Sequence, residues 1–179
     1  MSKPLSGLFR GTRGERSFKG DAEEVIASRV EGLDLREHPI DRKQLSGKRR
    51  KALQKKVENR TATREEYEAL EWDKRFNERR RRGVRRYWKQ ERERLARGEK
   101  GTRNWTEEQK AAILDKKVVR HNGKTLQAHH SYSASRYPHL ADRGEVMYPA
   151  TPYEHLYGRH GGNYKNSYPG KRVRKFHEF

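Results

Sequence analysis

The chain has 179 residues, 30% of them hydrophobic and 39% charged, so it can bury only a small apolar core. Its 44 Lys and Arg against 25 Asp and Glu give a formal charge of +19, which indicates a polyanionic partner such as nucleic acid. No apolar run approaches the roughly 20 residues that span a bilayer, and no signal peptide is expected after Met1. The absence of cysteine excludes disulfides, thiolate zinc sites and cysteine nucleophiles.

The N-terminal part of the chain is expected to form a basic extension in two segments. Residues 1–40 contain scattered Gly, Arg and Ser, which predicts a partly ordered basic arm with one short helix at 22–30. Residues 41–103 are expected to form a basic helical region. Between Arg42 and Arg103 there are 24 Lys or Arg and 10 Asp or Glu, so most of the net charge lies in this region.

Two helices are predicted within the basic region. The first begins near Asp41 and ends at Asn59. Thr63 and Glu66 form a capping box that opens a second, longer helix, in which Gly83 is expected to be a break. This helix carries four consecutive arginines, for which phosphate contact is the favoured interpretation and a solvated helix face the alternative: Arg79, Arg80, Arg81 and Arg82.

A capping box at Thr106 predicts the next helix, which ends near Asp115 and buries Ala112 or Ile113 together with Leu114. A β-hairpin is expected after it. Asn-Gly at 122–123 is a strong hairpin signal, because a type I′ turn needs two positive φ angles. The second arm of this hairpin is predicted to run on to 129–130.

The last elements are a strand at 146–150 and a helix. A capping box at Thr151 and Glu154, with Pro152 at the first helical position, predicts that the helix begins just before His155. Residues 171–179 are interpreted as a basic tail.

Six of the eight histidines fall between His121 and His160, and four of them are predicted to meet at one place. His129 and His130 end a strand, whereas His155 and His160 follow on the last helix. Adjacent residues of a strand point to opposite sides, so the paired histidines can perform different tasks. Imidazoles provide metal ligands and a base that titrates near neutral pH.

The segment 104–166 resembles the HNH/endonuclease VII-like nuclease toxin domains of the Gly-His-His (GHH) type, with Ala128 in place of the glycine. The motifs that carry the resemblance are Gln127-Ala128-His129-His130, Tyr137-Pro138-His139-Leu140-Ala141, Glu154-His155-Leu156 and His160-Gly161-Gly162-Asn163. The resemblance implies an HNH-like ββα-metal nuclease core over 104–170. The whole chain is therefore predicted to be an α+β protein with a mainly helical N-terminal region.

The resemblance also implies the roles of the four histidines. His129 is expected to bind a divalent metal ion, His130 to act as the general base, and His155 and His160 to complete the metal site. The ion is expected to be Zn, Ni, Mn or Mg, and purely imidazole ligation is less natural for Mg.

The spacing of the last two histidines leaves the third ligand open. Residues five apart diverge by about 140° on an α-helix, so His155 and His160 can share an ion only if the helix ends or loosens near Gly158. If His160 does not ligate, Glu154 or Asp142 is the next candidate.

Other residues near the histidines are expected to contact the substrate or support the site. Arg136 and Arg159 can bind phosphate bidentately. His139 is expected to hydrogen-bond the loop, and Asn163 to orient a site loop or form an ordinary turn. Four tyrosines either contact sugar and base or fill the core: Tyr132, Tyr137, Tyr153 and Tyr157.

The predicted function is metal-assisted hydrolysis of DNA phosphodiester bonds. The resemblance further implies a toxin domain delivered within a larger effector, acting in the target-cell cytoplasm during bacterial competition, and neutralised by an acidic immunity protein. One alternative is a non-catalytic nucleic-acid-binding protein with a structural His-ligated zinc. Another is an RNase or phage nuclease of the same fold.

Overall fold

The computed structural model describes residues 22–171 and 178–179, and it confirms the α+β class. The helices are α1 (Ala22–Arg29), α2 (Gly47–Glu58), α3 (Arg64–Ala96) and α4 (Glu107–Leu114), with short helical turns η1 (Pro138–Leu140) and η2 (Gly144–Val146) and a π-helix, η3 (Glu154–Arg159). The strands are β1 (Arg120–His121), β2 (Lys124–Thr125), β3 (Gln127–His130) and β4 (Met147–Ala150). No helix among the described residues is long and apolar enough to cross a membrane.

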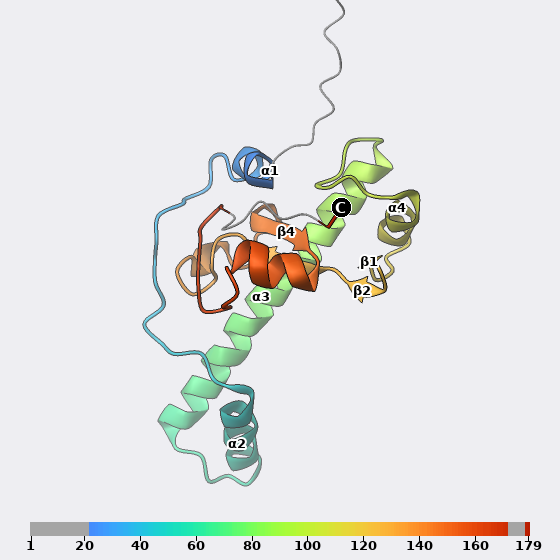
Figure 1. Ribbon diagram of the computed structural model, residues 1–179. Coiled ribbons are helices and arrows are strands. Elements are labelled where there is room, and N and C mark those ends of the chain that lie inside the picture. The colour runs from blue at the N-terminus through green and yellow to red at the C-terminus, as the bar shows by residue number, and fades with distance from the viewer. Residues whose placement is uncertain (1–21, 172–177) are drawn as a thin grey trace, which may run out of the picture.

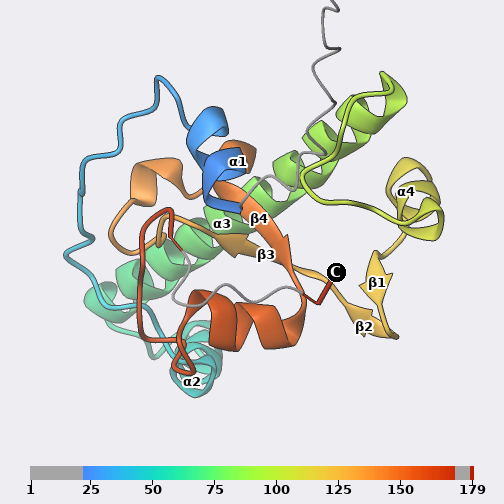
Figure 2. The same cartoon turned by 45° about the horizontal axis from the view of Figure 1, so that its top comes forward.

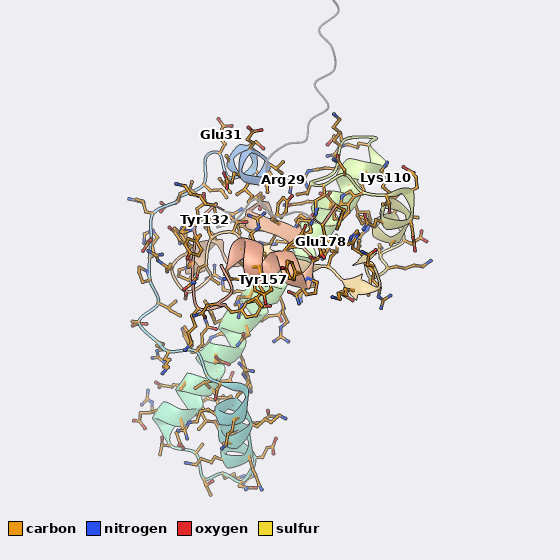
Figure 3. The ribbon with its side chains drawn as sticks, viewed as in Figure 1. Arg29, Glu31, Lys110, Tyr132, Tyr157 and Glu178 are labelled. Carbon is orange, nitrogen blue, oxygen red and sulfur yellow. The ribbon has the colours of Figure 1, made fainter. Side chains whose placement is uncertain are left out.

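Helix α3 is the axis of the molecule (Figure 1). Helix α2 lies along its N-terminal half, the β3–β4 pair with η3 lies across its middle, and α4 packs near its C-terminal end. Figure 2 shows α1 and β4 together on one side of α3. The α2–α3 hairpin extends away from the remaining elements, and its side chains project into solvent around it (Figure 3).

Both predicted capping boxes in this part of the chain are present, at Thr63 with Glu66 and at Thr106 with Gln109. Helix α3 nevertheless runs unbroken through Gly83, so the predicted break is wrong. A Cβ at Gly83 would lie 2.5 Å from the Ala141 carbonyl oxygen, so glycine allows the 141–147 segment to approach the helix backbone.

The predicted hairpin forms only in its first half. Asn122 and Gly123 have positive φ angles of 47° and 74°, and β1 pairs with β2 around them. The second arm ends at Thr125 and does not continue to the histidines. Strand β3 is a separate element that pairs antiparallel with β4, with His129 opposite Tyr148.

The main core lies between α1, α3 and the β3–β4 pair. Ile26 of α1, Tyr87 of α3 and Met147 of β4 are each at most 1% exposed and belong to one apolar cluster. Helix α1 is therefore packed in the folded body. Residues 1–21 of the predicted arm, and 172–177 of the predicted tail, lie outside the described part of the chain.

Two helix details differ from the sequence-based expectations. Helix α2 begins at Gly47 with Ser46 as its N-cap, and not near Asp41, because the Ser46 hydroxyl accepts a hydrogen bond from the Arg49 amide. In α4, Ile113 is buried as expected, but Leu114 is 43% exposed. The helix ends at Leu114 as predicted.

Candidate metal centre

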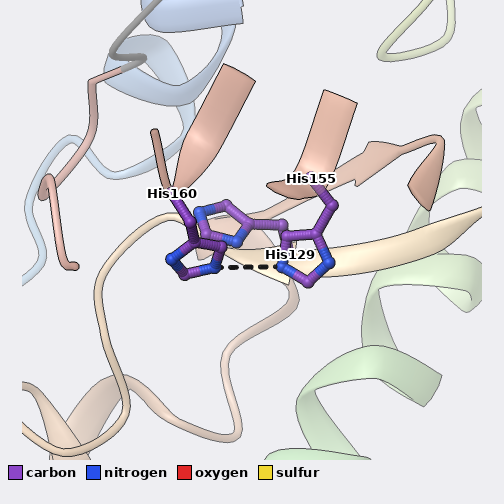
Figure 4. Close-up of side chains that lie close together, drawn as sticks. All are labelled: His129, His155 and His160. Carbon is purple, nitrogen blue, oxygen red and sulfur yellow. Dashed lines mark hydrogen bonds between the residues drawn. The ribbon is translucent and has the colours of Figure 1, made fainter. Parts of the chain in front are cut away.

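Three histidines from two elements converge on one point. His129 comes from β3, and His155 and His160 come from η3 and its C-cap. One nitrogen of each ring lies within 4.8 Å of a nitrogen of the others, and the three ring centroids are 4.9 Å apart (Figure 4). This is the set that the sequence predicts for the metal.

The five-residue spacing is accommodated by the π-helix. Glu154–Arg159 is wound as a π-helix, and the amide of His160 donates to the carbonyl of His155 at 3.2 Å, an i to i+5 bond. Residues five apart therefore return to nearly the same face, which they would not do on an α-helix. The helix does loosen, as the spacing requires, but it does so over the whole turn rather than by ending at Gly158.

The hydrogen bonds of His155 and His160 indicate which ring nitrogen of each carries the proton. Nδ1 of His160 is 2.7 Å from the Asn166 carbonyl oxygen, and Nδ1 of His155 is 2.6 Å from Oε1 of Gln127. Since these oxygens only accept, each Nδ1 carries a hydrogen and each neutral ring keeps its lone pair on Nε2. The two Nε2 atoms are 3.2 Å apart, as the dashed line in Figure 4 marks. Two lone pairs therefore face each other.

This arrangement fits a transition-metal ion. Ligands at 2.0–2.1 Å in tetrahedral geometry lie about 3.4 Å from one another, close to the observed Nε2 separation. A ligating histidine typically donates its other N–H to a carbonyl, as His160 does to Asn166. Imidazole nitrogens suit Zn, Ni or Co better than Mg.

The surroundings favour neutral imidazoles. Burial, together with the nearby His155 and Arg159, holds the pKa of His129 well below its usual value. Burial, with smaller effects of His160 and Arg159, lowers the pKa of His155 to about 4. The neutral ring is the form that binds metal, so His129 and His155 are ready to ligate at neutral pH.

His130 is not part of this cluster. Its Nε2 lies 2.9 Å from the Ala141 carbonyl oxygen, so Nε2 carries the hydrogen and Nδ1 keeps a lone pair. Burial lowers the pKa of His130 to about 4; the Ala141 bond opposes this shift, and Arg80 adds to it. The adjacent histidines therefore differ in environment, as alternation along a strand predicts.

The two carboxylates considered as alternative ligands are engaged elsewhere. Glu154 is buried and forms a two-bonded ion pair with Arg103, at 2.6 and 2.8 Å. It also accepts the Thr151 amide in the predicted capping box. Asp142 accepts from Arg86 at 3.0 Å. Neither belongs to the three-histidine set.

Two adjoining pockets lie beside the histidines. One, of about 520 Å³, is lined by all four histidines of the predicted site and by Arg136. The other, of about 540 Å³, is lined by basic residues of α2 and α3 and by His130. His130 and Arg80 line both, so a continuous basic surface leads from the metal cluster to the α2–α3 hairpin.

Only part of the arginine run faces this surface. Arg80 lines both pockets and Arg81 lines one. Arg79 and Arg82 lie 3.5 and 3.9 Å from carboxylate oxygens of Asp142. A helix turns about 100° per residue, so four consecutive arginines cannot share one face.

The other predicted substrate arginines lie in different settings. Arg136 lines the histidine pocket and pairs with Glu37. Arg159 is buried, with its guanidinium 4.3 Å from the centre of the Tyr148 ring. That position favours packing and an electrostatic influence on the histidines over direct phosphate contact.

The residues predicted to support the site also lie in different settings. His139 does hydrogen-bond a loop, with Nε2 2.7 Å from the Asp34 carbonyl oxygen. Asn163 is exposed and accepts the Lys165 amide in a turn, and its own amide donates to the His160 carbonyl at 3.1 Å. Asn166 also supports the site, because it accepts from the His160 ring and donates to the His160 carbonyl.

The tyrosines also separate by position. Tyr137 is buried and Tyr132 packs against the main core, whereas Tyr153 and Tyr157 are exposed and lie against each other. The sequence reasoning missed Tyr164. Its exposed ring lies 5.4 Å from His155 and 5.3 Å from His160, and only its place four residues after His160 could have suggested it.

Comparison with protein families gives one match. Residues 70–151 match the family described as a GHH signature containing HNH/Endo VII superfamily nuclease toxin. The matched segment takes in most of α3 with His129 and His130, and it ends before His155. No curated protein and no solved structure matches the chain. The resemblance drawn from the sequence motifs is thereby confirmed: residues 70–151 are similar to the GHH-signature HNH/Endo VII nuclease toxins.

Proposed function

We propose that this protein is a metal-dependent endonuclease that hydrolyses DNA phosphodiester bonds. The observation that carries the proposal is the 3.2 Å approach of the Nε2 atoms of His155 and His160, whose Nδ1 atoms each lie against an accepting oxygen, with His129 beside them. Such an arrangement is unfavourable without a cation between the rings. Three neutral ligands would leave a divalent ion its full charge and open positions, which suits an anionic substrate.

The reaction consumes water, breaks one P–O bond, and gives a phosphate monoester and an alcohol. A divalent ion held by these histidines would supply Lewis acidity at the scissile phosphate. His130 is the proposed general base: its Nδ1 lone pair takes a proton from the attacking water, while the Ala141 carbonyl holds the ring in place. Arg80 is the proposed phosphate contact, since it lines the pocket next to His130.

The preference for DNA rests on the extended basic surface. The pocket beside His130 is lined by Arg50, Lys74, Arg80 and Arg81 from both helices of the hairpin. A duplex carries one phosphate charge per about 1.7 Å of its axis, so a rod-like array of basic side chains suits it well. RNA is the second substrate to be tested.

The similarity to a family described as a nuclease toxin supports a biological role as a toxin. We propose delivery of this domain within a larger antibacterial effector and its neutralisation by an immunity protein. An acidic inhibitor would associate rapidly with a chain of charge +19, because complementary charge speeds encounter.

The direct test is incubation of the purified protein with supercoiled plasmid and, separately, with total RNA. Each is supplied with Zn, Ni, Mn or Mg, or with chelator. Nicking and linearisation of plasmid with at least one metal, abolished by chelator, is the expected result. Cleavage of RNA alone would mean that RNA, and not DNA, is the substrate. Binding without cleavage under any metal would favour a non-catalytic zinc protein.

A further inference from the structure

A second group of metal-binding side chains lies away from the three-histidine cluster. Asp34 and His38 come from the loop between α1 and α2, and His139 comes from η1. One ligand atom of each lies within 4.8 Å of the others. We infer that Asp34, His38 and His139 form a second, structural site for a divalent transition-metal ion such as Zn²⁺.

The backbone around this group is already fixed by hydrogen bonds between its two segments. The amide of His38 donates to the Arg136 carbonyl at 2.9 Å, and the amide of Ile40 donates to the Ser135 carbonyl at 2.9 Å. The His139 ring bonds the Asp34 carbonyl. A metal ion bound here would therefore need little backbone rearrangement, which limits the entropy lost on binding.

The donor atoms are of the right kind and spacing. Oδ2 of Asp34 and Nε2 of His38 are 3.1 Å apart, close to the roughly 3.4 Å edge of a tetrahedral zinc site. His139 donates through Nε2, so its Nδ1 holds a lone pair; Nδ1 is buried and has no hydrogen-bond partner among residues 22–171 and 178–179. Two imidazoles and a carboxylate suit Zn, Ni or Co.

The site is partly open, which suits a fourth position filled by water. The side chains of Asp34 and His38 are 36% and 50% exposed. Arg36 holds the same carboxylate through bonds of 2.8 and 2.9 Å, and it lowers the pKa of Asp34, so this acid is ionised. Arg36 is therefore the competitor that an incoming cation must displace.

The position of the site gives it a role. His139 is two residues before Ala141, whose carbonyl holds His130, and the loop of His38 lies against the segment that carries Arg136. An ion at this site would clamp the 30–46 loop onto the segment that supports the proposed general base. The ion would stabilise the proposed nuclease site without touching the substrate.

The test is the number of zinc ions bound per full-length chain, after chelator treatment, reloading and desalting. We expect two for the wild type, one for His155→Ala, one for His38→Ala, and none for the double variant. His121→Ala, which changes a histidine outside both groups, should still bind two. Asp34→Asn provides a second variant with almost unchanged side-chain size, and it should also bind one.

The two proposed sites fail independently in this experiment. A single ion in the wild type that is absent from His155→Ala but present in His38→Ala and Asp34→Asn would overturn the second site and leave the proposed nuclease metal intact. A single ion that is absent from His38→Ala but present in His155→Ala would do the reverse.

A location-specific readout supplements the count. In His155→Ala, added Zn²⁺ should slow hydrogen exchange at the amides of His38 and Ile40. Adding Arg36→Ala to this variant should make it bind Zn²⁺ more tightly than His155→Ala alone. Unchanged exchange at both amides under saturating Zn²⁺ would contradict the clamp.

Discussion

The two adjacent histidines of β3 differ in their surroundings. His129 is buried against two other imidazoles, whereas His130 is bonded to the Ala141 carbonyl and lines the basic pockets. We predict that His130→Ala keeps its metal and its DNA affinity and loses roughly 10²–10⁴-fold in cleavage rate, the usual contribution of a positioned base. Single-turnover cleavage and metal analysis on the same samples measure this.

The control for that variant is His121→Ala, on β1, whose ring lies against Phe179. It should cut at the wild-type rate. A His130→Ala protein that cuts plasmid as fast as the wild type, with its metal bound, would leave His130 as a packing residue.

The second residue-scale prediction concerns the third ligand. His155 and His160 have the same tautomer and face each other, so each should contribute equally to holding an ion. His155→Ala and His160→Ala should both lose nuclease activity and weaken metal binding at this site. Isothermal titration checks this. Normal metal affinity in His160→Ala would mean that the ion is held without it.

At the scale of elements, the packing of α3 on the 141–147 segment depends on the absence of a side chain at Gly83. Gly83→Ala would bring a Cβ to 2.5 Å from the Ala141 oxygen and 2.6 Å from the Met147 methyl. We expect a loss of about 1–3 kcal/mol in the free energy of unfolding, the usual cost of overpacking. Cleavage should also slow, since Ala141 supports His130.

Gly47→Ala is the matched control, because it lies at the start of α2 with nothing within 4 Å of its Cβ position. There the better helix propensity of alanine should leave stability unchanged or raise it by up to about 1 kcal/mol. Thermal and urea unfolding distinguish the two variants. Equal stability of both would show that the packing around Gly83 tolerates displacement.

Local signals predict most of the elements correctly, because capping boxes and the Asn-Gly turn act within four residues. Thr63, Thr106 and Thr151 all cap helices as expected. The wrong predictions concern tertiary contacts. The sequence predicts a break at Gly83 because propensity is local, whereas the role of this glycine is close packing with a segment about 60 residues later.

The site is predictable in its members and not in its geometry. Sequence motifs name the histidines, but the five-residue spacing of His155 and His160 conflicts with an α-helix, and only the π-helical turn resolves it. Asn166 and the Asp34–His38–His139 group cannot be found from sequence, because each depends on loop contacts. Asp34 and His139 lie more than 100 residues apart in the chain.

At the scale of the whole molecule, much of the positive charge lies on the α2–α3 hairpin. This hairpin cannot simply be deleted to measure its contribution to DNA binding. Helix α3 provides Tyr87 and Phe76 to the buried clusters, so deletion of the basic region would also remove part of the core. The electrostatic contribution must instead be measured by neutralising exposed side chains on α2, whose main packing among the described elements is against α3.

We predict that neutralising Lys48, Lys51 and Lys55 to Gln weakens plasmid binding. These side chains are exposed on α2, the helix whose Arg50 lines the pocket that includes His130. For each phosphate that the protein no longer neutralises, the slope of log affinity against log salt should fall by about 0.9, because fewer counterions are released. The control neutralises Lys116, Lys117 and Lys124, exposed residues beside β1–β2, with the same change in net charge. Equal weakening by both sets would show that net charge alone, and not the α2–α3 hairpin, recruits DNA.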